Sequence, residues 1–193
     1  MKLLMAFDSF KGTLTSLEAG NIACDAAQAV GYDSEVQVVS DGGEGLVDAF
    51  VYSNPAKLLE VCTVGPLFRE MKADFAISDE TAVIECASAA GLCLVPEEKR
   101  DPKVTTTFGV GLMIKAAVEN GARKIILGLG GSATNDGGTG MAAALGAVFR
   151  DQDGKEFVPT GGTLGKIAEI DISKLKKTVG KTKFIACYDV TNP

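Results

Sequence analysis

The chain has 193 residues, of which 46% are hydrophobic and 23% charged, and its formal net charge is −6 (19 Lys and Arg against 25 Asp and Glu). This balance is typical of a globular protein and excludes a disordered, collagen-like or disulfide-stapled chain. An acidic chain without a basic cluster has no electrostatic basis for binding DNA or RNA, and no apolar run is long enough to span a membrane.

Histidine is absent from the sequence. A Ser-His-Asp triad or a His-rich zinc site within this chain is therefore excluded, and acid–base chemistry has to come from Asp, Glu, Lys, Tyr or Cys. The five cysteines form no C-x-x-C pair and lie beside small or apolar residues, which favours reduced thiols. The N-terminal apolar run meets Asp8 too early for a signal peptide, so we expect a cytoplasmic protein.

Short apolar and β-branched runs alternate along the chain with helical patterns. Strands are predicted over Leu3–Phe7, Glu35–Val39, Leu58–Val64, Met71–Ile77, Thr81–Cys86, Lys124–Leu129 and Lys183–Cys187. The Leu58–Val64 and Met71–Ile77 strands are expected to pair through a turn at Gly65-Pro66. The polar, Gly-rich stretch 151–162 predicts a hairpin or an excursion from the main fold.

The first helix is signalled by a capping box, Thr15-Ser16-Leu17-Glu18, and is expected to end at Gly31. Its buried stripe is predicted from helical spacing to contain Leu17, Ile22, Ala26 and Val30. Two further helices are predicted over Phe108–Asn120, with Thr107 as its cap, and over Met141–Phe149.

Strand, helix and strand in succession are typical of βαβ units. We therefore predict an α/β fold with a mainly parallel sheet and flanking helices. Ligands of such sheets bind just past the carboxyl ends of the strands. The loops that follow the predicted strands are thus the places to look for chemistry.

The strongest of these loops is the Gly-rich segment Gly128–Gly140, between a predicted strand and a predicted helix. Its glycines let the backbone approach an anion closely, and free amides at the following helix start favour phosphate or carboxylate. Side-chain donors are available on Ser132, Thr134 and Asn135, while Asp136 could hold a cation. The segment matches neither a Walker A loop nor G-x-G-x-x-G, and a tightly packed βα turn is the simpler alternative.

Two acidic, glycine-containing loops follow the first two strands. In Asp8–Gly12 (Asp-Ser-Phe-Lys-Gly), Lys11 can neutralise a phosphate or carboxylate and Asp8 can serve a cation or a hydroxyl. In Asp41–Gly45 (Asp-Gly-Gly-Glu-Gly), the paired carboxylates Asp41 and Glu44 suit Mg²⁺. A helix-entry loop and an ordinary Asp-Gly turn are the alternatives for these two segments.

Three weaker candidates lie at or after later strands. Arg100 offers a guanidinium to a carboxylate, close to the hydroxyls of 105–107. Glu85 ends a strand and could face the same crevice, although a salt-bridged or solvated Glu is the better explanation. Asp189 could act as a base or as a metal ligand, or be an ordinary loop Asp. Acidic groups for Mg²⁺, Gly-rich amides and a Lys together describe phosphoryl transfer, without identifying the acceptor.

The motifs at 8–12, 41–45, 128–140 and 189–193 (Asp-Val-Thr-Asn-Pro) occur in the order found in the bacterial glycerate kinases, and the chain resembles that family over essentially its whole length. The resemblance implies ATP- and Mg²⁺-dependent phosphorylation of D-glycerate to 2-phosphoglycerate. It also implies a Rossmann-like domain and a second α/β domain with the active site between them. We place these at 1–75 and 76–193, the first being completed by sequence beyond Pro193.

The resemblance suggests roles for the candidate residues. Asp189 would be the catalytic base, assisted by Lys11 and Asp8, and Mg²⁺ would be held by Asp41, Glu44 or Asp136. Substrate or phosphate would be bound by Ser9, Arg100, Gly130, Gly131, Ser132, Thr134 and Asn135, with Lys11 and Arg100 as a clamp for the carboxylate. Whether the Gly-rich loop holds the nucleotide phosphates or the glycerate carboxylate stays open.

The chain departs from the family pattern at a few points, such as Phe68, where a Gly commonly follows Gly-Pro-Leu. Family members also continue well beyond Thr-Asn-Pro, so the chain looks like an N-terminal portion that could be inactive by itself. Its exposed sheet face could then be covered in a homodimer. The alternatives are a kinase for another small hydroxy acid and a non-catalytic module that binds phosphate or a nucleotide.

Overall fold

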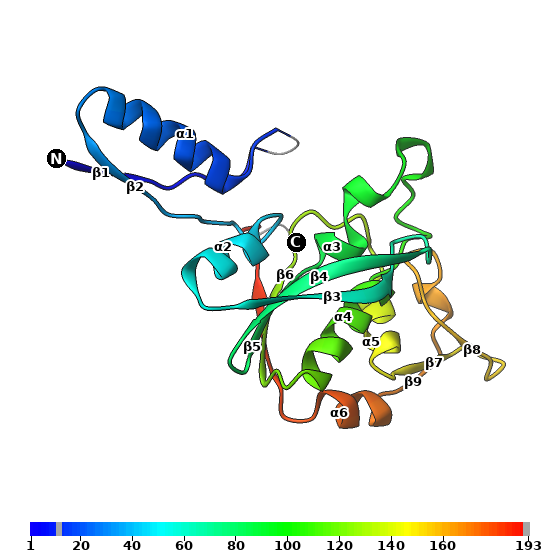
Figure 1. Ribbon diagram of the computed structural model, residues 1–193. Helices are drawn as coiled ribbons and strands as arrows, with labels where there is room; N and C mark the ends of the chain where they lie inside the picture. Colours follow the sequence, from blue (N-terminus) through cyan, green and yellow to red (C-terminus); the bar gives the residue numbers. More distant parts are fainter. Residues whose placement is uncertain (11–12, 191–193) are drawn as a thin grey trace.

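The computed structural model of the protein describes residues 1–10 and 13–190 (Figure 1). The strands are β1 (Lys2–Met5), β2 (Asp33–Val36), β3 (Lys57–Val64), β4 (Glu70–Ser78), β5 (Thr81–Glu85), β6 (Lys124–Gly128), β7 (Val148–Arg150), β8 (Glu156–Phe157), β9 (Glu169–Asp171) and β10 (Lys183–Cys187). The helices are α1 (Ser16–Ala29), α2 (Leu46–Ser53), α3 (Ala87–Ala90), α4 (Phe108–Glu119), α5 (Thr139–Ala144) and α6 (Ser173–Val179). All seven predicted strands and the first two predicted helices are confirmed.

The prediction of an α/β fold is confirmed, but the prediction of a mainly parallel sheet is wrong. A five-stranded sheet has the order β10-β6-β5-β4-β3, in which β10, β6 and β5 are parallel while β5, β4 and β3 alternate in direction. The connections from β3 to β4 and from β4 to β5 are too short for a parallel crossover, which needs a dozen or more residues, so these strands form hairpins. A two-stranded parallel sheet (β1-β2) and a three-stranded antiparallel sheet (β8-β7-β9) complete the fold.

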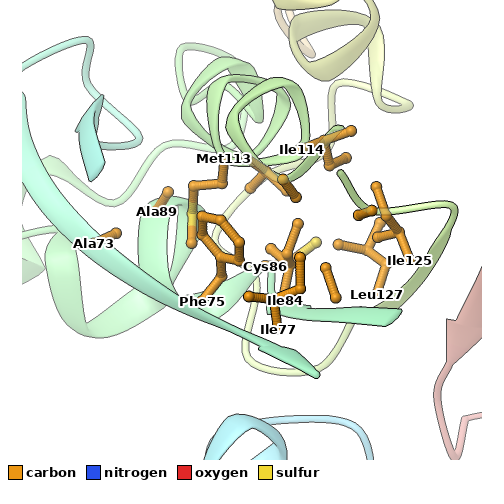
Figure 2. Close-up of a cluster of buried hydrophobic side chains, with 14 of the residues drawn as sticks. Ala73, Phe75, Ile77, Ile84, Cys86, Ala89, Met113, Ile114, Ile125 and Leu127 are labelled. Carbon is orange, nitrogen blue, oxygen red and sulfur yellow. The ribbon is translucent and has the colours of Figure 1, made fainter. Parts of the chain in front are cut away.

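Helices cover both faces of the five-stranded sheet. On one face, Met113 and Ile114 of α4 lie against Phe75, Ile84 and other apolar side chains of the sheet, all fully buried (Figure 2). On the other face, a smaller cluster joins Val47 of α2 to Ala76 and Val83. Alternate residues of β4 and β5 thus belong to different clusters, as expected for strands whose two faces are both covered. Strands β4 and β5 are therefore packed on both faces, whereas β10, at the edge of the sheet, stays largely exposed.

The first three elements, β1, α1 and β2, lie to one side of the five-stranded sheet (Figure 1). The capping box of α1 is confirmed, because the Thr15 side chain accepts from the Glu18 amide and the Glu18 carboxylate accepts from the Thr15 amide. The predicted buried stripe is wrong: Leu17, Ile22 and Val30 are exposed. Small residues face inward instead: Ala19, Gly20, Cys24 and Ala27 are buried. The packing is closest at Gly20, where a Cβ would lie 2.5 Å from the Val36 side chain of β2.

The third predicted helix is shorter than expected. It ends at Ala144 rather than Phe149, because Gly146 adopts a φ of +108° that reverses the chain, and Phe149 enters β7. The hairpin predicted within 151–162 is confirmed by the antiparallel pairing of β8 with β7.

The predicted boundary between two domains, at residue 75, falls within β4, and the division into domains stays a prediction. Within 1–10 and 13–190, no helix has the length and apolarity needed to cross a bilayer.

Phe68, in the turn between β3 and β4, adopts a φ of +57°, which is costly for a residue with a side chain. Its ring packs against Phe108 with the centroids 5.8 Å apart. Phe68→Ala loses the ring and keeps the backbone strain, whereas Phe68→Gly loses the ring and also relieves the strain. We therefore expect the Gly variant to be more stable than the Ala variant by about 1 kcal/mol in urea unfolding. An Ala variant of equal or greater stability would contradict this explanation.

Candidate functional site

The candidate site begins where three parallel strands end together. Glu85 of β5 and Cys187 of β10 are both in register with Gly128 of β6, so the loops after these strands leave from one edge of the sheet. The main-chain pairing continues one step further, since the Leu129 amide donates to the Cys187 carbonyl at 3.0 Å. All the candidate loops were expected at one edge of a single sheet, because each follows a predicted strand. This expectation is confirmed for the loops after β5, β6 and β10, but it is wrong for the strands β1 and β2, which form a separate sheet.

The Asp41–Gly45 segment packs directly on this edge, although β2 before it belongs to another sheet. The Gly130 amide donates to the Gly42 carbonyl at 3.1 Å. A Cβ on Gly42 would lie 2.6 Å from the Cys187 carbonyl oxygen, and one on Gly130 would lie 2.6 Å from the Gly43 Cα. Only glycines allow this approach, so the structure brings three of the predicted loops into contact.

The Gly-rich loop Gly128–Gly140 is held along most of its length. The Ala133 amide donates to Ala90 at 2.8 Å, the Leu92 amide donates to the Gly131 carbonyl, and the Thr105 hydroxyl donates to the Ala133 carbonyl. Thr105 is thus buried and engaged within the protein rather than offered to a ligand. Within the described residues, the amides of Gly131 and Ser132 have no acceptor. These amides can bind an anion.

Asp136 at the end of this loop is fully buried, and its carboxylate accepts four hydrogen bonds. The donors are the Thr107 amide and hydroxyl (2.8 and 2.9 Å), the Gly138 amide (3.0 Å) and the Gly140 amide (3.2 Å). The expectation of free amides at the start of α5 is therefore wrong, because Asp136 and its neighbours take them up. The same contacts do not suit Asp136 as a ligand of Mg²⁺.

A cavity of about 260 Å³ lies between the Gly-rich loop and the segment 92–102, and three predicted binding residues line it: Arg100, Ser132 and Thr134. The Arg100 Nε donates to the Val95 carbonyl at 3.3 Å, which leaves the two terminal nitrogens for another acceptor. The Ser132 and Thr134 hydroxyls lie 2.7 Å apart. Asp101 lines the same cavity, and its Oδ1 accepts from the Lys103 amide. A cation and hydroxyls in a small cavity suit a small carboxylic acid.

A larger cavity of about 630 Å³ lies between the start of α1 and helix α2. Ser9 and Glu44 line it, together with apolar side chains such as Leu14 and Val51. Glu44 also accepts a hydrogen bond from the Cys93 thiol at 3.4 Å. The structure therefore separates Ser9 and Glu44 from the smaller cavity that Arg100 lines.

The other predicted residues lie outside these cavities. Asp8 and Asp41 are exposed and accept from the Ser9 amide and the Gly43 amide, respectively. Asp189 is exposed just past β10, Gly131 and Asn135 are exposed in the Gly-rich loop, and Lys11 lies outside the described residues. No three His, Cys, Asp or Glu side chains form a metal-binding group in the described part of the chain. Magnesium binds through as few as one or two carboxylates, which Asp41 and Glu44 can supply.

Glu85, a weaker candidate in the sequence, supports the start of α2. Its carboxylate accepts from the Val47 amide at 2.8 Å. Burial raises the pKa of Glu85 above its ordinary 4.5, the hydrogen bonds from Val47 and Gly45 oppose this shift, and the charges of Asp48 and Glu44 add to it. The position of Glu85 at a strand end was the signal in the sequence, but its partner on α2 could not be foreseen.

The raised pKa of Glu85 predicts a pH dependence of stability. The folded protein binds this proton more tightly than the unfolded chain, so the carboxyl favours folding increasingly as the pH falls from neutral toward 4.5. Glu85→Gln removes this contribution and keeps an oxygen acceptor for Val47. We expect the free energy of unfolding of the original protein, minus that of the variant, to increase as the pH falls, which urea unfolding at several pH values measures. A constant difference, or one that shrinks, would rule out the effect.

The chain is similar in sequence and in fold to known glycerate kinases. The chain is 44% identical to a glycerate kinase of Bacillus subtilis and 43% identical to a glycerate 2-kinase of Escherichia coli, in each case over all of this chain and 52% of the relative. A crystal structure of a candidate glycerate kinase 2 from Salmonella typhimurium LT2 superposes with a TM-score of 0.84 at 41% identity, covering 53% of that protein. The chain thus spans about half the length of these relatives.

A protein-family pattern matches nearly the whole chain. The pattern of the "Glycerate kinase family" matches residues 3–193, which include every loop described above. Because this match covers nearly all of the sequence, the chain belongs to the glycerate kinase family.

Proposed function

We propose that this protein transfers the γ-phosphate of ATP to the C2 hydroxyl of D-glycerate, giving ADP, 2-phosphoglycerate and a proton. The observation that carries the proposal is the small cavity lined by Arg100, Ser132 and Thr134, next to the free amides of the Gly-rich loop. Its volume of about 260 Å³ lies below the roughly 300–1,000 Å³ of pockets for drug-sized ligands. A three-carbon acid suits such a cavity better than a nucleotide does.

Each part of glycerate finds a chemically matched group there. The terminal nitrogens of Arg100 bind the carboxylate in a bidentate, charge-assisted manner. The hydroxyls of Ser132 and Thr134 donate to the same carboxylate, and the Asp101 carboxylate accepts a hydroxyl of the substrate. Glycerol lacks the carboxylate that Arg100 recognises, and it should be a poor substrate.

The transfer itself requires removal of one proton. We assign this to Asp189, which follows β10 at the edge where the Gly-rich loop begins. As the C2 oxygen forms its bond to the γ-phosphorus, the bond from that phosphorus to the bridging oxygen of ADP breaks, and Asp189 accepts the hydroxyl proton. Asp41 and Glu44 would hold Mg²⁺, which, when bound, neutralises charge on the phosphates.

Asp8 and Ser9 retain their proposed roles toward the cation and the phosphates. Lys11, which lies outside the described residues, stays a candidate for neutralising a phosphate or the substrate carboxylate. Gly130, Gly131 and Asn135, which flank the cavity-lining residues 132–134 in the chain, stay proposed binding residues. A homodimer and a cytoplasmic location stay predictions.

Arg100 provides the test of this proposal. The assay uses the chain and an extended chain, which continues past Pro193 with the second half of the Bacillus subtilis relative, and it measures ADP release with Mg-ATP and D-glycerate. In the extended chain, Arg100→Ala should raise the KM for glycerate by about 10–100-fold, equal to the roughly 1.5–3 kcal/mol of a charged hydrogen bond, with little change in the KM for ATP. Arg100→Lys should recover only part of the loss.

Neighbouring lysines supply the control for Arg100. Lys99 and Lys103 are exposed, do not line the cavity and should tolerate Ala without a change in KM. An unchanged glycerate KM in Arg100→Ala would contradict the carboxylate site. Turnover with another hydroxy acid, but not with D-glycerate, would replace the substrate. Nucleotide binding without any turnover would favour a binding module instead.

A further inference from the structure

Asp136 and Thr107 form a buried pair that joins three segments of the chain. Asp136 is fully buried and Thr107 is 6% exposed. The Thr107 hydroxyl donates to Asp136 Oδ2 and accepts from the Met141 amide, both at 2.9 Å. One hydroxyl thus links the end of the Gly-rich loop, the start of α4 and the first turn of α5.

The pair fixes the far end of the loop segment that carries the proposed binding groups. The near end of that segment is held at Ala133, between the Ala90 carbonyl and the Thr105 hydroxyl. Thr134 and Asn135 therefore lie between two anchors, both attached to the residues just before α4. The start of α5 is closely packed against Thr106 and Asp136, because a Cβ on Gly140 would overlap Thr106 Oγ1 and lie 2.8 Å from Asp136 Oδ2.

Neither member of the pair can contact a ligand, since both are buried and their polar atoms are engaged with each other and with backbone amides. Substitution of Thr107 leaves every residue that lines the small cavity chemically intact. Any effect on substrate binding must therefore act through the position of Ser132 and Thr134.

We propose that Asp136 and Thr107 are positioning residues, which hold the Thr134 hydroxyl in place in the cavity that Arg100 also lines. Through its 2.7 Å contact with Thr134, the Ser132 hydroxyl is positioned as well. This inference rests on the proposed function, because the readout that matters most is glycerate binding. It also explains why the Gly-rich loop contains a fully buried acid whose oxygens are taken up by hydrogen bonds within the protein.

The test compares two substitutions at Thr107 in the extended chain. Thr107→Val keeps the shape of the side chain but removes the hydroxyl, and Thr107→Ser restores it. Thr107→Val should raise the KM for glycerate by about 10-fold, as expected for loss of roughly 1.4 kcal/mol of binding, with a smaller change in kcat and in the KM for ATP. Thr107→Ser should return the glycerate KM close to the original value, and Asp136→Asn should act in the same direction as Thr107→Val.

Thr63 provides a matched control. It is a buried threonine whose hydroxyl donates to the Gly109 carbonyl of the same helix, α4, and it does not contact the loop. Thr63→Val should lower the Tm without changing the glycerate KM. If Thr107→Val behaves in the same way as Thr63→Val, the pair is merely structural and the proposal is overturned.

A second readout separates this proposal from the proposed function. Hydrogen exchange of the ligand-free protein should be faster over residues 131–135 in Thr107→Val than in Thr63→Val. Failure of the unsubstituted extended chain to phosphorylate glycerate would count against the proposed function, and hydrogen exchange would then decide whether the pair anchors the loop. Unchanged exchange over 131–135 would overturn the anchoring whatever the substrate is.

Discussion

Replacement of Asp189 by Asn in the extended chain should lower kcat by about 10²–10⁴-fold, the range that general acid–base catalysis contributes, while the Kd for ATP stays unchanged. The chain has no histidine, so the proton of the attacking hydroxyl has to be taken by another group. An exposed carboxylate just past a parallel strand is suited to this role, because it can approach a substrate held by the neighbouring loop. The amide of Asn keeps the size of Asp189 but cannot accept the proton.

The control for Asp189 is Asp153, which is exposed in the turn between β7 and β8 of the separate three-stranded sheet and lines neither cavity. Asp153→Asn should leave kcat and both KM values unchanged. If Asp189→Asn retains full turnover, Asp189 is not the base, and Asp41 and Asp8 become the next carboxylates to substitute. A loss of ATP affinity in parallel with turnover would instead indicate a binding role.

Gly42→Ala should destabilise the protein by about 3 kcal/mol, because two costs add at this residue. Its φ of +96° is unfavourable by roughly 1–2 kcal/mol for a residue with a Cβ. The new Cβ would also lie 2.6 Å from the Cys187 carbonyl oxygen, and relief of such overpacking costs about 1–3 kcal/mol. The clash falls where the Asp41–Gly45 segment contacts β10, so the loops of the site should separate. Urea unfolding measures the loss.

Gly45 supplies a close control within the same segment. Its φ is +91°, yet a Cβ there would meet nothing within 4 Å. Gly45→Ala should therefore lower the free energy of unfolding only by the cost of the positive φ, about 1–2 kcal/mol. Equal stability of the two variants would show that the close contact between the Asp41–Gly45 segment and β10 contributes nothing to stability.

Much of the fold could be read from local patterns. The capping box at Thr15 and the β-branched runs of the seven strands depend on neighbouring residues only, and the structure confirms them. The pairing of β3 with β4 through the turn at Gly65-Pro66 is also confirmed. The prediction of a mainly parallel sheet was wrong, because the short turn before β5 requires antiparallel pairing there too. The exposed face of α1 was misjudged because helical spacing marks Leu17 and Ile22 as a stripe, whereas close packing against Val36 selects Gly20.

The site was predictable where it depends on strand ends and unpredictable where it depends on distant partners. Glycines after β2 and β6 indicated loops of close approach, and Gly42 and Gly130 do meet. Asp136 was interpreted as a metal ligand, because its donors, above all Thr107, come from another loop 29 residues earlier in the chain. Nothing in the sequence shows that Arg100 shares a cavity with Ser132.

The most direct test of the proposed function is to identify the product by phosphorus NMR. The extended chain is incubated with Mg-ATP and D-glycerate, and the mixture is compared with authentic 2- and 3-phosphoglycerate, with the Bacillus subtilis relative as a positive control for the assay. The proposal predicts 2-phosphoglycerate and ADP in equal amounts, and none of either when glycerate is omitted. Formation of 3-phosphoglycerate, or ADP release that does not depend on glycerate, would contradict it.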